Sequence, residues 1–224
     1  MRRIVLVGAG ALLALATGCS TYRTRDFPLA RTASTYIGSD TGQGLTLAAE
    51  ALVRPARCER YLWFDCVRWG YLPVVVRVKN ATESSFQMER ARVKCVLGDG
   101  TTFEVAPIDQ VIEDMSYSGG RAFFSFVCGI IPGIVHLIHL NATNTDLRAD
   151  YEEKHLFVDR DVLRVGPDDR LTGVIFFRLP EGVGHGTLDL ANALLEVRTV
   201  KERSAEGGDV EEVVIRPQVE SAGQ

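Results

Sequence analysis

Short runs in which hydrophobic and polar residues alternate dominate the chain, and they predict β-strands. The clearest strand is YLPVVVRVKN at residues 71–80, which is rich in β-branched residues and ends at a turn-forming asparagine. Residues 90–97, RARVKCVL, alternate cleanly between basic and hydrophobic residues, and the GDG at 98–100 predicts a hairpin turn. The positions expected to face inward on that strand are Ala91, Val93, Cys95 and Leu97.

Further strands are expected at residues 44–54, 101–106, 161–165, 171–180 and 186–200. About seven short strands separated by turns predict a mainly β protein, folded as an antiparallel β-sandwich. We expect this domain to cover residues 44–200, followed by a polar C-terminal tail at 201–224, in which VEEVVIRPQV adds at most an edge strand.

The pattern becomes helical between residues 107 and 158, which predicts an α-helical insertion in the sandwich. Its first helix follows Pro107 and carries hydrophobic residues at helical spacing, namely Ile108, Val111, Ile112 and Met115. A second helix is predicted to begin at Asn144 or Thr145, either of which is a suitable N-cap, and to continue to about residue 158. Its apolar stripe is thin (Leu147, Tyr151 and Leu156), so we expect that helix to lie on a surface.

Between these helices lies an apolar stretch at residues 119–141, which has no formal charge after Arg121. Its 19 residues from Ala122 to Leu140 approach the ~20 that a membrane-spanning helix needs. Pro132 interrupts the stretch, and a single crossing would put strands of one sandwich on opposite sides of a bilayer. We therefore predict a bent apolar insertion that either packs on the sandwich or faces a membrane or a protein partner. The residues proposed for such a contact are Phe123, Phe124, Phe126, Ile130, Ile131, Ile134 and Leu137.

The first residues, MRRIVLVGAGALLALATGCS, combine two arginines, an apolar run and small residues before Cys19. This segment resembles a bacterial lipoprotein signal, in which the cysteine is acylated and becomes the first residue of the mature chain. The resemblance implies a signal peptide at residues 1–18, lipidation at Cys19, and a location at the bacterial cell envelope, in the outer membrane and facing the periplasm. Residues 19–43, rich in Ser, Thr and Gly, are expected to form a flexible tether.

Charge limits the partners that this chain can attract. Removal of residues 1–18 leaves 23 of the 25 basic residues against 29 acidic ones, a formal net charge of −6. That balance disfavours nucleic acid as a partner. The partners expected from the signal segment and the apolar stretch are the membrane, through Cys19, and another envelope protein.

Four cysteines besides Cys19 remain: Cys58, Cys66, Cys95 and Cys128. An even number in an oxidising compartment suggests disulfides, and three pairings are possible. Cys58 and Cys66 enclose a short loop and form the first candidate pair, which leaves Cys95 with Cys128. The alternative is that they are buried free thiols, since cysteine is among the most buried residue types.

The motifs of common enzyme classes are missing, and we expect neither a cofactor nor a metal site nor catalytic residues. The sequence contains no GxSxG elbow, P-loop or dinucleotide fingerprint. His136 and His139 have the i, i+3 spacing of a metal pair but no acidic or cysteine partner in register, while His155 and His185 are expected at the surface. The aromatic segment YLWFDCVRW at residues 61–69 suits either sugar stacking or core packing.

Three stretches, GLTLAAEALV, LPVVVRVKNATESSF and LTGVIFFRLPEG, resemble the strand pattern of secreted bacterial lipoproteins with an immunoglobulin-like (telokin-like) sandwich. The likeness covers about 100 of the 224 residues and implies fold and envelope location, without catalytic residues. The function expected is a non-catalytic binding or scaffolding module. The alternatives are a lipoprotein that binds a lipid or a glycan and, less favoured, a hydrolase.

Overall fold

The computed structural model describes residues 39–116, 130–157, 161–185, 187–202 and 210–221. For residues 130–141, 202, 210, 220 and 221 it describes the backbone alone. Two compact units are distinguished within these residues. One is a β-sandwich that includes the chain to Met115 and resumes at Asp150, and the other is the part of the insertion that ends at Ala149.

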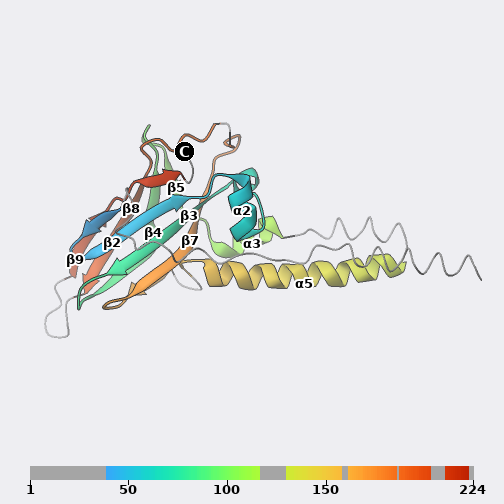
Figure 1. Cartoon of the computed structure of the whole chain (residues 1–224), viewed down its shortest axis with the longest axis horizontal. Coiled ribbons are helices and arrows are strands. Elements are labelled where there is room, and N and C mark those ends of the chain that lie inside the picture. The colour runs from blue at the N-terminus through green and yellow to red at the C-terminus, as the bar shows by residue number, and fades with distance from the viewer. Residues whose placement is uncertain (1–38, 117–129, 158–160, 186, 203–209, 222–224) are drawn as a thin grey trace, which may run out of the picture. The chain divides into compact units, whose positions relative to one another are not determined.

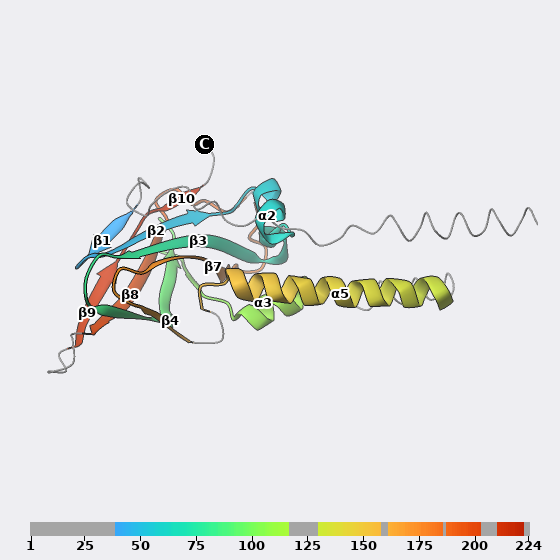
Figure 2. The ribbon, with the colours of Figure 1, turned by 60° about the horizontal axis from the view of Figure 1, so that its bottom comes forward.

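Among the described residues, ten strands form the two sheets of the sandwich, which Figures 1 and 2 show as two layers. Sheet A contains β1 (Asp40–Gly42), β2 (Leu45–Ala51), β3 (Tyr71–Asn80) and β7 (Arg170–Arg178) in that order, with β10 (Val219–Ser221) parallel to β2. Sheet B contains β5 (Thr102–Glu104), β4 (Ser85–Val96), β8 (Leu194–Glu202) and β9 (Val210–Ile215) in that order, with β6 (Val162–Val165) also paired to β4. Every other pairing is antiparallel.

The order of the strands is that of an immunoglobulin-like Greek key. β2, β3 and β7 occupy the places of strands A, B and E in one sheet, and β4, β8 and β9 those of C, F and G in the other. The predicted fold class, a mainly β immunoglobulin-like sandwich with an α-helical insertion, is therefore confirmed.

The interior between the sheets is almost entirely hydrophobic, as the alternating pattern predicts. Large buried side chains come from both layers, including Phe177 on β7 and Phe86 on β4. Alternation accounts for the inner positions of β2 and β3, where Leu47 and Val78 are cross-strand partners and are both buried. This shared interior holds the two sheets together.

In the part of the chain that the structure describes, three α-helices and one 3₁₀ helix accompany the sheets. They are α2 (Pro55–Leu62), the 3₁₀ helix η2 (Cys66–Trp69), α3 (Ile108–Met115) and α5 (Ile130–Lys154). The four hydrophobic residues predicted to form the buried face of the first inserted helix are all buried in α3. Pro55 lies in the first turn of α2, where its missing N–H leaves no hydrogen bond unmade.

The insertion begins and ends at the free edge of β7. The amide of Ala106 donates to the carbonyl of Phe176 at 2.7 Å, and the amide of Leu156 donates to the carbonyl of Val174 at 3.0 Å. Because these two acceptors lie two residues apart on one strand, both ends of the insertion are fixed next to each other. The two ends of the insertion also cover the edge of β7, which would otherwise expose unpaired backbone groups.

Several sequence predictions differ from the structure in the insertion. The second helix does not begin at Asn144 or Thr145, because α5 starts at Ile130 and both residues lie inside it. Pro132 does not bend the described part of the insertion either, since it occupies the first turn of α5, where proline is tolerated. Residues 117–129 lie outside the described part of the chain.

The sheets also extend beyond residues 44–200. β1 lies in the segment predicted as a tether, while β9 and β10 lie in the segment predicted as a polar tail. Val213 and Ile215 of β9 are buried in the core, so VEEVVI is a structural strand whose outward positions are charged. Ala91 is exposed, contrary to the alternation, because a β-bulge between Met88 and Val93 shifts the register of β4 against β8.

Candidate functional site

Helices cover one end of the outer face of sheet A, and we call this group the helical cap. It consists of α2, η2, α3 and residues 150–157, which include the last residues of α5. The hydroxyl of Tyr151 donates to the carbonyl of Leu62 at 2.5 Å, and Nζ of Lys154 donates to the carbonyl of Tyr61 at 2.8 Å. The end of α5 is thus hydrogen-bonded to the C-terminal end of α2, whose last carbonyls have no partner within that helix.

Two polar contacts attach the cap to the sheet beneath it. The hydroxyl of Tyr71 on β3 donates to the carboxylate of Asp114 on α3, and burial together with this bond raises the pKa of Tyr71. Glu50 on β2 accepts ion pairs from Arg57 on α2 at 2.7 Å and from Arg77 on β3 at 3.3 Å. Glu50 and Arg77 are only 9% and 4% exposed, so removal of one partner leaves a buried charge uncompensated.

A cluster of sulfur atoms and one phenol lies inside the cap. Cys58 and Cys66 are fully buried free thiols, and Sγ of Cys66 donates to the carbonyl of Phe64 at 3.5 Å. Sγ of Cys58 also donates to the carbonyl of Leu52 at 2.7 Å, and Sγ of Cys66 lies 4.0 Å from the hydroxyl oxygen of Tyr151. The same hydroxyl is 3.4 Å from Sδ of Met115. The sequence-predicted pair is therefore brought together, without the predicted disulfide bond.

Burial governs the reactivity of these thiols. It raises the pKa of Cys66 well above its ordinary value, and the hydrogen bond from the neighbouring Cys58 raises it further. Cys95, which lies apart from them in the core between the sheets, has its pKa raised by burial to about 12. Because the thiolate is the nucleophile, Cys66 and Cys95 are unreactive as folded thiols. Cys58 is shielded from solvent by its complete burial. Cys128 lies outside the described residues.

His155 is buried, contrary to the prediction that it lies at the surface. Its ring is 3% exposed and stacks on Phe176, with centroids 6.1 Å apart, while Tyr151 stacks on the same phenylalanine at 5.5 Å. Nδ1 accepts a hydrogen bond from the amide of Phe157 at 3.2 Å, so the neutral ring carries its proton on Nε2. That Nε2 is buried without a hydrogen-bond partner.

The protonation of His155 follows from these surroundings. Burial lowers its pKa to about 4 and outweighs the opposite effect of the hydrogen bond from the Phe157 amide, while the positive charge of Arg90 makes a smaller contribution in the same direction as burial. The imidazole is therefore neutral at physiological pH. An added proton would go to Nδ1, where it would break the hydrogen bond from the Phe157 amide and place a charge against Phe176.

The segment that follows α5 runs alongside β7, and its backbone lies very close to that strand. Residues 155 and 174 form a parallel bridge, so the segment that follows α5 runs as a short extra strand. A Cβ atom on Gly173 would lie 3.0 Å from Cα of Leu156, closer than nearly all such contacts. Glycine is needed at residue 173 because the backbone of the insertion passes against it.

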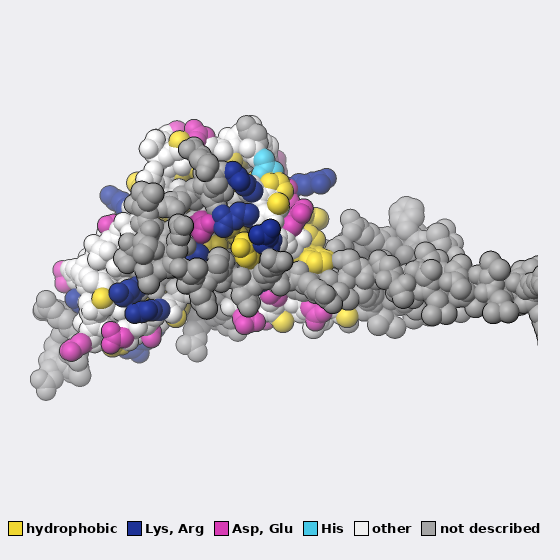
Figure 3. Space-filling view, viewed as in Figure 1, with side chains coloured by type: hydrophobic (Ala, Val, Ile, Leu, Met, Phe, Trp, Pro, Cys, Tyr) yellow, Lys and Arg dark blue, Asp and Glu magenta, His cyan; other side chains and the backbone are white. Residues whose placement is uncertain are grey.

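Basic and aromatic side chains lie on the outside of the cap. Trp69 at the end of η2 is 48% exposed, and its ring meets Phe64 edge to face at 6.3 Å. His185, at the surface as predicted, contacts the carboxylate of Asp65 at 2.8 Å. Figure 3 shows Lys and Arg side chains beside hydrophobic ones and a histidine in the area where Figure 1 places α2. Of the two roles considered for residues 61–69, core packing applies to Leu62, Cys66 and Val67, while Trp69 is available to solvent.

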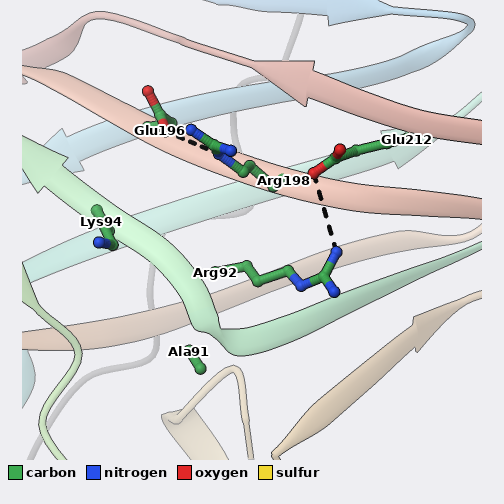
Figure 4. Close-up of a pocket in the computed structure, with 6 residues that line it drawn as sticks. All are labelled: Ala91, Arg92, Lys94, Glu196, Arg198 and Glu212. Carbon is green, nitrogen blue, oxygen red and sulfur yellow. Dashed lines mark hydrogen bonds and ion pairs between the residues drawn. The ribbon is translucent and has the colours of Figure 1, made fainter.

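A charged hollow of about 490 Å³ lies on the outer face of sheet B (Figure 4). The residues that line it are Ala91, Arg92, Lys94, Glu196, Arg198 and Glu212. Arg92 pairs with Glu89 at 2.8 Å, and Glu196 pairs with Arg198 at 3.1 Å and Arg216 at 3.0 Å. Burial acts to raise the pKa of Glu196, but these two guanidinium groups outweigh it and lower the pKa. All the charged residues that line the hollow except Lys94 thus form ion pairs, typical of a solvated sheet face.

The residues predicted to touch a membrane or a partner are only partly covered by the structure. Phe123, Phe124 and Phe126 lie outside the described residues, as does Cys19. Ile130, Ile131, Ile134 and Leu137 fall within α5, where the backbone alone is described. No helix among the described residues combines the length and the hydropathy that a bilayer crossing requires.

Sequence reasoning missed the contacts inside the cap. The contact of Tyr151 with Leu62 joins residues 89 positions apart, and no local pattern indicates it.

The described residues contain no group of three His, Cys, Asp or Glu side chains that could hold a metal ion. His136 and His139, the metal pair considered from spacing, lie in the part of α5 described by its backbone alone.

Comparisons with known proteins return nothing for this chain, because no family model, curated protein or solved structure matches it. The protein can therefore be classified by its fold: it is an immunoglobulin-like sandwich whose helical insertion is fixed at both ends to one strand.

Proposed function

We propose that this protein is a lipid-anchored periplasmic envelope protein that acts as a non-catalytic binding or scaffolding module. In this proposal Cys19 is acylated and holds the chain at the outer membrane. The apolar segment 119–141 makes a second contact, with the membrane or with another envelope protein. The support from the sequence is the lipoprotein-like signal at residues 1–18 and the uncharged run in the insertion.

One structural observation carries the scaffolding part of the proposal. Both ends of the insertion are hydrogen-bonded to neighbouring carbonyls on β7, and the last residues of α5 are bonded to α2. In this proposal a partner that binds the segment is held to the sandwich through both of these attachments. Surface loops are usually more mobile and less firmly attached than this segment.

The chemistry of the described residues supports a non-catalytic role. The candidate nucleophiles Cys58, Cys66 and Cys95 are buried, and burial raises the pKa of the Cys66 and Cys95 thiols. Tyr71 is held in the protonated form by burial and by Asp114. The carboxylates of the hollow on sheet B are engaged by arginines. These groups suit structure and recognition better than general acid–base or nucleophilic catalysis.

Fractionation of three variants tests the two contacts. The variants are C19A, a quadruple variant with Gln at Ile130, Ile131, Ile134 and Leu137, and their combination. We expect the C19A variant to remain partly on membranes and the combined variant to become soluble. The matched control replaces two exposed hydrophobic residues of the sandwich, Val162 (39% exposed) and Val214 (42% exposed), by Gln in the C19A background. It should fractionate like C19A alone.

The outcomes separate the parts of the proposal. Binding of the C19A variant to protein-free vesicles assigns the second contact to lipid, and binding only to native membranes assigns it to a protein. A C19A variant that is wholly soluble rules out a second contact. A wild-type protein that lacks acyl chains by mass spectrometry rules out the anchor itself.

A second candidate function is binding of a small lipid or glycan, and Trp69 is the observation that favours it. Its ring is 48% exposed and is supported edge to face by Phe64, an arrangement that presents a flat apolar surface. Titration of the full-length protein in detergent with oligosaccharides or with lysophospholipid, followed by tryptophan fluorescence, tests it. A change that W69F abolishes supports this function, and an unchanged spectrum contradicts it.

A further inference from the structure

The two thiols of the helical cap are both fully buried, on two helices that contact each other. Cys58 lies on the buried side of α2 together with Leu62, and Cys66 is the first residue of η2. Between them α2 ends at Trp63, whose left-handed φ of 68° turns the chain back. Asp65 then starts η2, because its side chain accepts a hydrogen bond from the amide of Arg68. This reversal packs η2 against α2. Both thiols are fully buried there, and Cys58 is close enough to raise the pKa of Cys66.

We infer that Cys58 and Cys66 form a disulfide bond when the chain folds in the presence of a disulfide oxidant, and that this bond stabilises the helical cap. In the reaction each thiol loses one proton, and a bond forms between the two Sγ atoms. The two electrons cleave the S–S bond of the oxidant, which leaves as two thiols. With glutathione disulfide the product is two molecules of glutathione. The inference concerns the pairing alone and does not depend on where the protein resides.

The geometry selects this pair over a pairing of either of these thiols with Cys95. Cys95 lies on β4 in the core between the sheets, where its cross-strand partners are Phe103 and Leu195. Sheet A separates that core from the cap, and a disulfide needs Cα atoms within roughly 7 Å. Cys95 therefore serves as an internal control, a buried thiol that has no neighbouring thiol among the described residues.

The folded structure also determines when the bond forms. Burial leaves Cys66 protonated, and neither thiol is accessible to an oxidant in solution. Exchange therefore takes place while the chain is unfolded or the cap is open. The fully folded reduced protein should oxidise much more slowly than the refolding chain.

Formation of the bond has a structural consequence for the cap. Cys66 lies beside the hydroxyl of Tyr151, and Cys58 is hydrogen-bonded to the carbonyl of Leu52 at the end of β2. A covalent link between them joins α2 to η2 directly beneath the end of α5. It restricts the unfolded chain and keeps the surface that receives Tyr151 assembled.

Peptide mapping of the refolded full-length protein tests the pairing. The protein is reduced and unfolded in guanidinium, refolded in a glutathione redox buffer with a metal chelator, and quenched in acid. It is then unfolded again, alkylated without reductant and digested with trypsin. Cleavage after Arg57, Arg60 and Arg68 releases CER and YLWFDCVR, which contain one cysteine each and stay joined only through a disulfide.

We expect the joined peptides to be the major form and to separate on reduction, while the Cys95 peptide is alkylated. A C95A variant should give the same joined pair, and a C58A variant should leave Cys66 alkylated. Alkylation of Cys58 and Cys66 to the same extent as Cys95 overturns the pairing. So does the recovery of either cysteine joined to a different one.

Denaturant unfolding tests the second half of the inference. The oxidised protein should unfold at a higher guanidinium concentration than the same protein after reduction. The C58A/C66A double variant should show no dependence on reductant, and C95A should keep the wild-type dependence. An unfolding midpoint that is the same with and without reductant overturns the stabilising role, even where peptide mapping finds the bond.

Discussion

The core between the sheets and the helical cap on the outer face of sheet A are two buried regions held together in different ways. The core is lined by aliphatic and aromatic side chains with hardly any polar atoms. The cap contains two thiols, a phenol, a neutral imidazole and the ion pairs of Glu50. β7 contributes to both, because Phe177 faces the core and Phe176 faces the cap.

This difference means that the two regions respond to different conditions. Hydrophobic burial depends little on pH or redox state, so the core should keep the sandwich intact wherever the protein is placed. The cap depends on the protonation of His155 and on the state of Cys58 and Cys66. Because the cap holds one end of the insertion, solution chemistry can loosen the insertion without unfolding the sandwich.

The largest expected effect comes from truncating the two neighbouring phenylalanines of β7. Both are fully buried, so F177A and F176A should each lower the free energy of unfolding by about 3–5 kcal/mol. Their local effects should differ, because only F176A removes the ring on which Tyr151 and His155 stack.

Hydrogen exchange distinguishes these two variants. F176A should accelerate exchange at residues 150–157 well before the core strands open, whereas F177A should accelerate exchange across both sheets together. Equal exchange profiles would contradict the division into two regions.

The second expected effect is a pH dependence that comes from His155. Its pKa is about 4 in the folded protein against an ordinary value of 6.5, so the unfolded chain binds the extra proton between these values. The stabilisation is complete above pH 6.5 and decreases as the pH falls, by about 1.4 kcal/mol per pH unit down to about pH 4. Below pH 4 both states are protonated and this contribution stops changing.

An H155F variant isolates this contribution, since phenylalanine keeps a ring against Phe176 but cannot take up a proton. The difference in unfolding free energy between wild type and H155F, measured by denaturant titration from pH 7.5 to 4, should change by about 3 kcal/mol in favour of H155F at low pH. F177A should keep the wild-type pH dependence. A constant difference between wild type and H155F would show that His155 is accessible to protons in the folded state.

The third effect concerns the backbone contact at the edge of β7. A G173A variant places a Cβ atom 3.0 Å from Cα of Leu156, so it should cost about 1–3 kcal/mol of unfolding free energy. Gly184 has no atom within 4 Å of the same position, so G184A is the matched control and should be nearly neutral. Equal thermal denaturation of the two variants would mean that the insertion does not press on β7.

The core was more predictable from the sequence than the cap, and the reason is the range of the contacts. Alternation is a local property, so residues 71–80 reveal a strand and its inward positions without knowledge of its partners. The cap instead joins residues far apart, such as Lys154 and Tyr61. The sequence after His155 shows only that two hydrophobic residues, Leu156 and Phe157, follow a helix. It does not indicate that His155 itself is buried.

Local signals also failed where tertiary structure competes with them. Asn144 and Thr145 favour a helix start, but as interior residues they cost only a few tenths of a kcal/mol each relative to better helix formers. A helix that is already formed from Ile130 therefore continues through them. In the same way, the charged residues of VEEVVI suggest a tail, although β9 needs only Val213 and Ile215 to face the core.

The smallest expected effect tests the hydrogen bond that joins α5 to α2. A Y151F variant keeps the ring stacked on Phe176 and removes only the hydroxyl that donates to the carbonyl of Leu62. That carbonyl also accepts from the amide of Phe64 at 2.8 Å, so it is not left without a donor. The cost in unfolding free energy should therefore be only about 1 kcal/mol and independent of pH. Hydrogen exchange at residues 150–157 should increase while the core strands stay protected, and a loss of protection in β4 or β8 would mean that the cap and the core are one cooperative unit.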